Sequence, residues 1–563
     1  MKLVCMACTQ RKKSQALKDL ASEPCGYFRS EISLLRDLSL VSSLGSSVIM
    51  SSFSSIEEAT KQDSPLEKEL IPIAEDVEGV SQGPIVRVAT TPPAPLTELD
   101  KGLIAWDSLK DPQNPLYWPT RKRLVNMILI SCLTFISPLG SSIFAPGIDL
   151  TLKDLHTSSK AIGSFMITIF LLGYCLGPMF LGPLSEIFGR RPIILISSWL
   201  FTLFLLGCSF VKNMAGLIVL RFFAGTAGSA VMNLAPAIVA DLYPIERRSF
   251  SMAIVLIVQS VSPAAGPICG GFIAQQLSWR WTYWILTMAS GVVTTFAMLL
   301  FRECYAPAVL AKKTIRLRKE LRREDLHSKL ALRVTRKELL KRSLIRPIKL
   351  LTRSPVAFLN ALYVATNYGM LYLLLTTITQ LFVDQYGFSI QIAGLTYIGF
   401  AAGMVLALLI LMNTQDRTVA KLRARNNGVF EPEMRLTNLI FVAMWVGPAL
   451  IMYGFTAKYQ VHWIAPVIAL FLFGFGQVAI FMGTQTYVVD SFSQYAASAV
   501  ASVSFLRSLV GTFLPFAGPP LYDTLGVDWG NAVLGFIAIS LTPMIILFKR
   551  YGRTIRLKFP VEL

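Results

Sequence analysis

Four charged side chains stand inside or at the ends of long apolar stretches of this sequence, namely Arg221, Asp241, Asp490 and Arg507. A charge at the centre of a membrane helix costs about 2.5–3.5 kcal/mol on insertion scales, so we expect it to face a bundle interior or a wet cavity. Charges in such positions mark the passage of ions, protons or solutes rather than covalent chemistry.

The two arginines differ in their place along the chain. Arg221 lies near the start of its apolar stretch, so it either faces the interior or reaches to the membrane interface. We place it off the packing seams, so that its replacement by alanine should leave folding largely intact. Arg507 lies midway along its stretch and either pairs with Asp490 or lines a cavity. Asp241 and Asp490 each end a stretch, where an acid opposes the helix dipole, so a nearby cation is expected.

A short polar loop, GPLSEIFGRRP, follows the second apolar stretch. Gly182 and Gly189 permit a tight turn. Glu186 and Arg190 are four positions apart and can pair across it, and Arg191 adds a second positive charge. Taken alone, the loop is also explained as a basic turn on the cytoplasmic side.

Small residues and a proline cluster in the fifth apolar stretch, at Gly266, Pro267, Gly270 and Gly271. Small residues let helix backbones approach closely, and proline permits a bend. An ordinary packing face explains the same pattern.

Aromatic and amide side chains inside the stretches are candidates for the wall of a substrate cavity. Most amides in membrane helices join one helix to another, and only a few face a substrate. The candidates are Phe165, Phe222, Asn233, Tyr368, Tyr372, Gln485 and Tyr487.

The elements that must position these residues are membrane helices. The chain is 53% hydrophobic and only 15% charged, with a mean hydropathy of +0.55. A span needs about 20 apolar residues, and about twelve such stretches are present. They are 124–145, 161–181, 192–211, 215–240, 250–273, 282–301, 355–382, 391–412, 436–456, 464–489, 496–519 and 530–548.

The distribution of the net charge of +19 indicates which loops face the cytoplasm. Basic residues precede the first apolar stretch, follow the second, fourth, eighth and twelfth, and fill the segment 302–352 after the sixth, whereas loops on the other side have few. This is the positive-inside pattern, and it predicts that both termini are cytoplasmic. The same pattern argues against nucleic acid as a partner, because the charge belongs to the membrane topology.

Two parts of the chain carry the same residues in the same order at one constant offset. The pairs are Pro267 and Pro515, Gly270 and Gly518, Leu277 and Leu525, and Trp281 and Trp529. A duplicated half in so hydrophobic a chain indicates a transporter built from two parallel repeats. We therefore predict an all-α membrane protein with two six-helix bundles, related by a pseudo-two-fold axis along the membrane normal.

Enzymatic and metal chemistry find little support. The three histidines, His156, His327 and His462, form no catalytic constellation, and Cys5 and Cys8 are a single CxxC without a second pair. We expect no cofactor and no metal.

The loop with Glu186 and Arg190 closely resembles the signature loop of the major facilitator superfamily, with Glu186 in the place of the usual Asp. The set NPLYWP before the first stretch, WRWTYW before the sixth, PEMRL before the ninth, and Asp490 through Arg507 resembles fungal drug:proton antiporters with twelve spans. The resemblance covers about residues 105–550.

This resemblance implies roles for the residues above. The loop from Gly182 to Arg191 holds the two halves together in the outward-facing state, and Arg190 or Arg191 serves Asp241 in a charge relay. Arg221, with Gly225, matches the antiporter motif whose arginine is assigned to proton transfer. The residues Gly266 to Gly271 match the motif that seals drug antiporters against leak.

The expected organisation has five parts. Residues 1–120 are a cytoplasmic tail, largely disordered, in which order begins near Trp106 at the membrane interface. Residues 121–301 and 353–549 are the bundles, 302–352 a basic linker, and 550–563 a second tail. Around Leu317 to Leu340 the linker is either an amphipathic helix on the anionic leaflet or a solvated segment.

We predict a proton-coupled efflux transporter of the plasma membrane. Its substrates would be amphipathic organic molecules such as fungal secondary metabolites, toxins or antifungal drugs. The expected partners are the lipid bilayer, protons and the substrate, and the expected state is a monomer. Polyamine export and proton-coupled nutrient uptake are the alternatives; the first would need acids in the pocket, and the glycines at 266–271 argue against the second.

Overall fold

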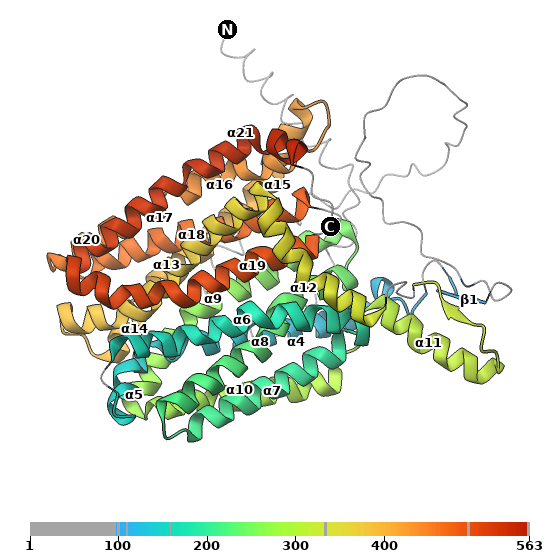
Figure 1. Cartoon of the computed structure of the whole chain (residues 1–563), viewed down its shortest axis with the longest axis horizontal. Helices are drawn as coiled ribbons and strands as arrows, with labels where there is room; N and C mark the ends of the chain where they lie inside the picture. The colour runs from blue at the N-terminus through green and yellow to red at the C-terminus, as the bar shows by residue number, and fades with distance from the viewer. Residues whose placement is uncertain are drawn as a thin grey trace, which may run out of the picture. The chain divides into compact units, whose positions relative to one another are not determined.

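The computed structural model describes residues 97, 102–108, 111–157, 159–330, 335–492 and 496–559. They all belong to one compact unit, Ala89–Leu563, and the unit Met1–Val88 lies outside the described residues together with the expected disordered tail. The described part is a set of long helices with one pair of very short strands (Figure 1).

The first half of the unit contains six long helices joined by short turns. Asn213 caps one of them by accepting a hydrogen bond from the backbone N–H of Gly216 (2.9 Å), as a helix start requires. The helices are α4 (Thr120–Ser142), α6 (Lys160–Phe188), α7 (Arg190–Phe210), α8 (Met214–Leu242), α9 (Ile245–Gln276) and α10 (Trp279–Leu300). The short elements η4 (Pro115–Tyr117), η5 (Ala145–Gly147) and α5 (Ile148–Asp154) flank α4.

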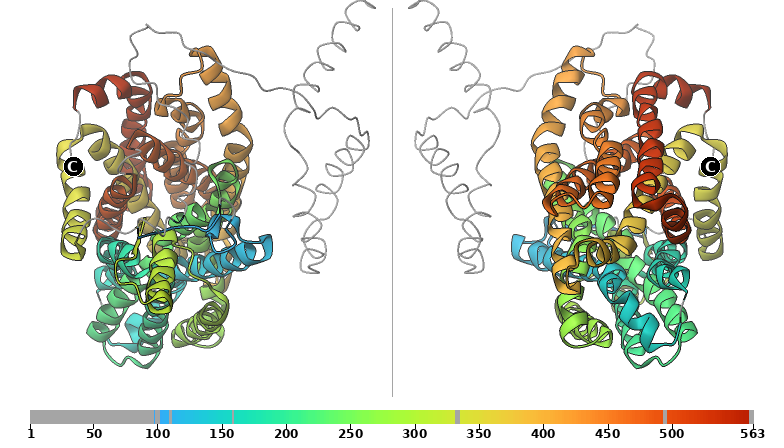
Figure 2. Two further views of the ribbon diagram at one scale, coloured as in Figure 1. Left: turned by 90° about the vertical axis from the view of Figure 1, so that its right-hand side faces the viewer. Right: turned by 90° about the vertical axis from the view of Figure 1, so that its left-hand side faces the viewer.

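The second half repeats this pattern with more interruptions. Its elements are α13 (Pro355–Tyr386), α14 (Ile390–Leu395), α15 (Tyr397–Arg425), η6 (Pro432–Arg435), α16 (Leu436–Ala443), α17 (Val446–Lys458), α18 (Ile464–Ser491), α19 (Ala496–Phe513), η8 (Leu514–Ala517), α20 (Gly518–Leu541) and α21 (Pro543–Lys558). In Figure 2 the helices coloured blue to green and those coloured yellow to red gather into two groups.

Eleven helical segments of the described residues are long and apolar enough to cross a membrane. The last of them, Ser498–Lys558, has 61 residues, about three times what one crossing needs. It is broken inside α20 at Gly526, whose φ of +75° is not helical. Figure 1 shows the chain running one way along α19 and back along α20 and α21. This segment therefore accounts for both the eleventh and the twelfth predicted stretches.

Helix packing follows the sequence repeat. Within the halves, α6 packs on α8 as α15 packs on α18, and α4 packs on α9 as α13 packs on α19. Between the halves, α6 contacts α19 and α15 contacts α9. One two-fold operation exchanges these two crossings, because it takes α6 to α15 and α9 to α19. The predicted fold is confirmed in this packing.

The linker contains α11 (Ala306–Leu321) and α12 (Arg336–Arg353), and it holds the segment that precedes the first span. Leu103 and Ile104 form β1, which pairs in parallel with β2 (His327–Ser328). The ammonium of Lys313 lies 2.7 Å from the carboxylate of Asp107. Trp106 is buried in this small assembly. The expected continuous helix over Leu317 to Leu340 is also interrupted, since α11 ends at Leu321 and β2 follows.

Candidate transport site

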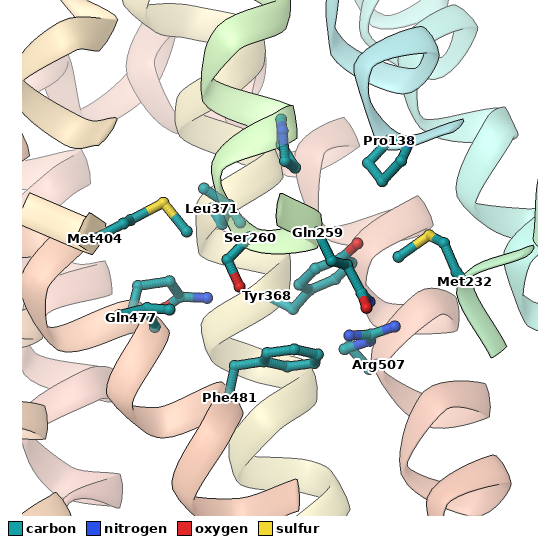
Figure 3. Close-up of a pocket in the computed structure, with 12 residues that line it drawn as sticks. Pro138, Met232, Gln259, Ser260, Tyr368, Leu371, Met404, Gln477, Phe481 and Arg507 are labelled. Atoms are coloured by element: carbon teal, nitrogen blue, oxygen red, sulfur yellow. The ribbon is translucent and has the colours of Figure 1, made fainter. Parts of the chain in front are cut away.

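A pocket lies where the two halves meet (Figure 3). Its empty volume, including the space that is open to solvent, is about 440 Å³. Helices α4, α8 and α9 of the first half and α13, α15, α18 and α19 of the second half contribute its wall. The lining residues are Pro138, Met232, Gln259, Ser260, Pro263, Tyr368, Leu371, Met404, Gln477, Val478, Phe481 and Arg507.

Arg507 is the charged residue of this lining. Its guanidinium lies over the rings of Tyr368 (4.6 Å to the centroid) and Phe481 (4.9 Å). Arg507 is only 6% exposed, and its Nε has no hydrogen-bond partner within the described residues. Of the two positions considered from the sequence, Arg507 lies in the pocket lining, and the carboxylate of Asp490 pairs with Arg435 instead.

Amide and hydroxyl groups complete the polar part of the wall. Gln259, Ser260 and Gln477 are all buried, and Oε1 of Gln477 accepts no hydrogen bond in the described part of the chain. Gln259 and Gln477 are visible in the sequence as amides within apolar stretches. The remaining wall is apolar and carries no carboxylate.

Arg221 lies outside this pocket, in the core of the first half. Its Nε donates to the carbonyl of Met166 (2.6 Å), and Nη1 donates to the hydroxyl of Tyr283 (2.9 Å). Nη2 donates to the carbonyls of Ser141 (3.1 Å) and Ile167 (3.4 Å). These partners belong to α4, α6 and α10, so one side chain of α8 ties three neighbouring helices together.

The surroundings of Arg221 agree with the expected interior position and contradict the expectation that it lies off the packing seams. The residue is 1% exposed, and its guanidinium lies over the rings of Phe144 (5.3 Å) and Phe170 (5.7 Å). It therefore neither reaches the membrane interface nor lies off the packing seams. The physical reason is that the arginine fork can satisfy several helix carbonyls at once, which makes an interior position tolerable without a carboxylate. Its replacement by alanine is now expected to damage the fold.

An ion pair joins the ends of α7 and α8 next to the linker. Nε of Arg190 lies 3.2 Å from the carboxylate of Asp241, and Nη1 donates to the hydroxyl of Ser185 (2.6 Å). The guanidinium also lies 4.7 Å from the ring centroid of Tyr305, whose pKa burial raises to about 12. The tyrosine therefore stays neutral at physiological pH. Of the two cations expected to serve Asp241, Arg190 is the one in contact.

Glu303 holds the connection between α6 and α7. Its carboxylate accepts hydrogen bonds from the backbone N–H groups of Arg190 (3.0 Å) and Arg191 (3.0 Å), at the N-terminus of α7. Arg191 also donates from Nη2 to the carbonyl of Met298 (2.9 Å). Gly189 has a φ of +98°, and a Cβ there would strike the Glu303 carboxylate, so this glycine is required.

Glu186 and Gly182 have less constrained surroundings. The positive charges that act on Glu186 are those of Arg190 and Arg346, the second of which lies on α12. The closest carboxylate partner of Arg190 is Asp241 rather than Glu186. Gly182 lies inside α6 rather than in the predicted turn, because α6 continues to Phe188 and α7 begins at Arg190. A Cβ on Gly182 would meet no atom within 4 Å.

The second half has a corresponding ion pair. Arg435, at the end of η6, pairs through its Nε with the carboxylate of Asp490 at the end of α18. Nearby, Nη2 of Arg556 lies 3.2 Å from the carboxylate of Glu433. The cations expected near both aspartates are therefore present, one in each half.

The glycine cluster of α9 lies at the opposite end of the bundle. A Cβ on Gly270 would overlap the carbonyl oxygen of Ile143, and one on Gly266 would overlap the hydroxyl of Ser142. Gly271 faces the second half, where a Cβ would lie 3.0 Å from the carbonyl oxygen of Ile390 in α14. The backbone beside Pro267 also approaches α14, at Gly394. The motif packs α9 on α4 and on the other half at once.

Most of the other cavity candidates lie outside the pocket lining, apart from Tyr368. Phe165 packs on Phe516 (4.8 Å between centroids), and Phe222 packs on Phe223 (5.3 Å). Tyr372 shares a hydrogen bond with the hydroxyl of Ser141 (2.9 Å). Phe165 and Tyr372 therefore belong to contacts between helices, whereas the contact of Phe222 lies within α8.

The last three candidates lie on α8 and α18. The amide of Asn233 donates to the carbonyl of Ser229 in its own helix (2.8 Å). Tyr487 stacks on Phe548 of α21 (6.1 Å), and Gln485 is half-buried on α18. Sequence reasoning missed Met232, Ser260 and Phe481, because nothing separates them from other residues of apolar helices.

Comparison with known proteins agrees with this geometry. The profile described as Major Facilitator Superfamily matches residues 130–515. The chain belongs to the Major Facilitator Superfamily. It is a multi-pass membrane transporter and not an enzyme, and its substrates are small molecules.

Similar curated proteins come from fungi. The chain is 42% identical to the MFS-type transporter penM of Penicillium rubens over 457 residues, which cover 81% of this chain and 90% of that protein. It is 36% identical to the efflux pump radE of Floropilus chiversii over 460 residues, or 82% and 86% of the two chains. Among solved structures, the xylose transporter XylE of E. coli in a partially occluded inward open conformation gives a TM-score of 0.55 at 14% identity. That match covers 77% of this chain and 98% of the other, and it shows the fold.

Proposed function

We propose that this transporter exports amphipathic organic molecules, such as fungal secondary metabolites or antifungal compounds, across the plasma membrane in exchange for protons. The observation that carries the proposal is the pocket between the two halves, with its apolar wall and its few buried polar groups. A similar fungal protein is named an efflux pump, which supports the outward direction.

Contacts at the end away from the linker support transport by rocking of the halves. There the backbone of α9 at Pro267 and Gly271 packs closely on α14, and the amide of Gln380 donates to the carboxylate of Asp149 (2.8 Å). These contacts close that end of the pocket. Rocking that breaks them and closes the linker end would expose the pocket to the other side of the membrane.

The proton-coupling groups in this proposal are the two ion pairs at the linker end. Each pair lies within one half, so protonation of Asp241 or Asp490 would remove the charge that holds Arg190 or Arg435 and free the helix ends of that half to move when the linker end closes. Arginine keeps its charge at all physiological pH values. Arg221 would then act by fixing the geometry of α8 rather than by carrying the proton, and the loop from Gly182 to Arg191 would transmit the change to α12.

The proton gradient is large enough for this task. One charge crossing 100 mV supplies about 2.3 kcal/mol, and one pH unit adds about 1.4 kcal/mol. Their sum corresponds to a substrate gradient of about 500-fold. The basic loops at the linker end support a cytoplasmic position for that end and for both termini. Because a single chain encloses the whole pocket, we expect a monomer.

The direct test uses the full chain in yeast that lacks its own drug pumps. A screen of toxic compounds identifies a substrate, and inside-out plasma-membrane vesicles then measure its uptake under an imposed pH gradient. We expect uptake that a protonophore stops, with empty-vector vesicles as the control. Uptake that continues under the protonophore would exclude antiport, and net movement in the other direction would favour nutrient import. A preference for polyamines would favour the other alternative, which the lack of a carboxylate in the pocket wall disfavours.

A further inference from the structure

We propose that Arg507 is the anchor for a negatively charged group of the substrate, so that the transporter carries amphipathic organic anions. This inference rests on the proposed transport function, since it assigns the substrate class of the same pocket. The expected anionic groups are a carboxylate or an acidic enol or phenol attached to an apolar body.

The first argument is the missing counter-charge. Arg507 is nine-tenths buried in the pocket wall, and in the described part of the chain its Nε donates to nothing. Burying an ionised group without a partner is costly, and proteins normally pair such groups. The pocket wall contains no carboxylate, and Asp490 is held by Arg435. The buried, unpaired Nε and the lack of a carboxylate in the lining are explained together if an anionic substrate binds the guanidinium, shifts this side chain and supplies the missing acceptor.

The second argument is the way in which Arg507 is held. The rings of Tyr368 and Phe481 lie within 5 Å of the guanidinium and keep it at the surface of the pocket. Contacts with ring faces stabilise a cation without using its N–H groups. The planar fork therefore stays available for a carboxylate, which it binds in a bidentate manner.

The other residues of the pocket wall indicate which further groups the substrate should carry. Oε1 of Gln477 is a buried acceptor without a donor, so the ligand should also carry a hydroxyl or N–H group. Leu371, Met404 and Val478 present apolar surface, which suits a ring or an alkyl chain. A packing role alone for Arg507 would be served better by an uncharged side chain of similar size.

The test compares two probes of the same shape, 2-naphthoate and 2-naphthamide, which differ in charge. Titration calorimetry on the purified full-length protein measures the Kd of each for the unchanged chain and for Arg507→Gln, Arg507→Lys and Arg550→Gln. Arg550 is exposed, so its variant matches the loss of one positive charge without touching the pocket.

We expect the unchanged protein and Arg550→Gln to bind naphthoate about tenfold more tightly than naphthamide, because a charge-assisted hydrogen bond is the stronger one. Arg507→Gln should bind both probes equally, and Arg507→Lys should keep part of the preference. Naphthamide binding by Arg507→Gln shows that this variant is folded. The proposal is overturned if naphthoate does not bind at millimolar concentrations, if the unchanged protein does not distinguish the probes, or if Arg507→Gln keeps the preference. The assay uses no gradient, so a failure of proton coupling leaves its result unaffected.

Discussion

Arg221 and Arg507 are both buried arginines in membrane helices, yet they are satisfied in opposite ways. Arg221 donates hydrogen bonds to carbonyls of two neighbouring helices and to the hydroxyl of Tyr283. Arg507 is held by two aromatic rings, and its Nε is left without an acceptor. A buried charge whose donors are all used supports the fold, whereas one with an open donor is available to a ligand. Substitutions of Arg221 should therefore mainly lower stability, whereas substitutions of Arg507 should mainly weaken substrate binding, and the two effects can be measured independently.

The largest loss of stability is expected for Arg221→Ala. The change leaves a cavity and removes the hydrogen bonds that tie α8 to α4, α6 and α10, which should destabilise the protein by about 3–5 kcal/mol. Thermal unfolding in detergent, followed by size-exclusion chromatography, measures the effect. Arg221→Lys is the matched control, and it should recover part of the stability because it keeps the charge but not the fork. If Arg221→Ala unfolds at the same temperature as the unchanged protein, Arg221 does not stabilise the fold and its role is purely functional.

A smaller loss is expected for Tyr283→Phe, which removes the hydroxyl that accepts from Nη1 of Arg221 and keeps the ring. A buried donor next to a charge is then left unpaired, which costs about 1–3 kcal/mol. The same unfolding assay measures it. Tyr397→Phe is a control on a buried tyrosine whose hydroxyl meets no charged group, at the carbonyl of Leu375 (3.0 Å). If Tyr283→Phe and Tyr397→Phe lose the same stability, the hydrogen bond from Arg221 does not make the Tyr283 hydroxyl more stabilising than an ordinary buried hydroxyl.

The comparison also shows what the sequence can predict. Apolar stretches of about 20 residues determine where helices cross, and basic residues between them indicate their direction, because both properties are local. The repeat around Pro267 and Pro515 likewise predicts the two-fold packing of α9 and α19. The ion pair of Arg190 and Asp241 follows from the family resemblance together with the need for a cation at a helix C-terminus.

The face on which a residue lies is less accessible to sequence reasoning. A position near the start of a stretch leaves open whether Arg221 faces the interior or reaches the interface. Its helix turns it towards the core, where three other helices supply acceptors. Tyr487 and Phe222 resemble cavity residues in type and depth, yet they pack on neighbouring aromatics. The pocket takes residues from seven helices, so its wall depends on packing that no single stretch reveals. The pairing of β1 with β2 joins segments far apart in the sequence and has no local signal.

Arg507→Met should change stability by less than about 1.5 kcal/mol in either direction, because methionine fills a similar volume and an unpaired buried charge is lost. Export of an anionic substrate should nevertheless fall about tenfold or more. The measurement pairs the unfolding assay with vesicle uptake under a pH gradient. If Arg507→Met is as unstable as Arg221→Ala, Arg507 supports the fold and the distinction between the two arginines disappears.

The smallest change in stability is expected for Gln477→Leu. Its Oε1 has no donor in the described part of the chain, so an apolar side chain of similar size should cost less than about 0.5 kcal/mol or should stabilise slightly. Substrate affinity should fall about three- to tenfold, because a neutral hydrogen bond contributes about 0.5–1.5 kcal/mol. Titration with 2-naphthoate and with 6-hydroxy-2-naphthoate, which adds a donor remote from the carboxylate, measures the difference. The added hydroxyl should improve binding to the unchanged protein and should have no effect on binding to Gln477→Leu. If the hydroxyl improves binding equally in both proteins, Oε1 of Gln477 does not bind the substrate and the side chain only fills space. Arg507 would then be the remaining polar anchor of the pocket.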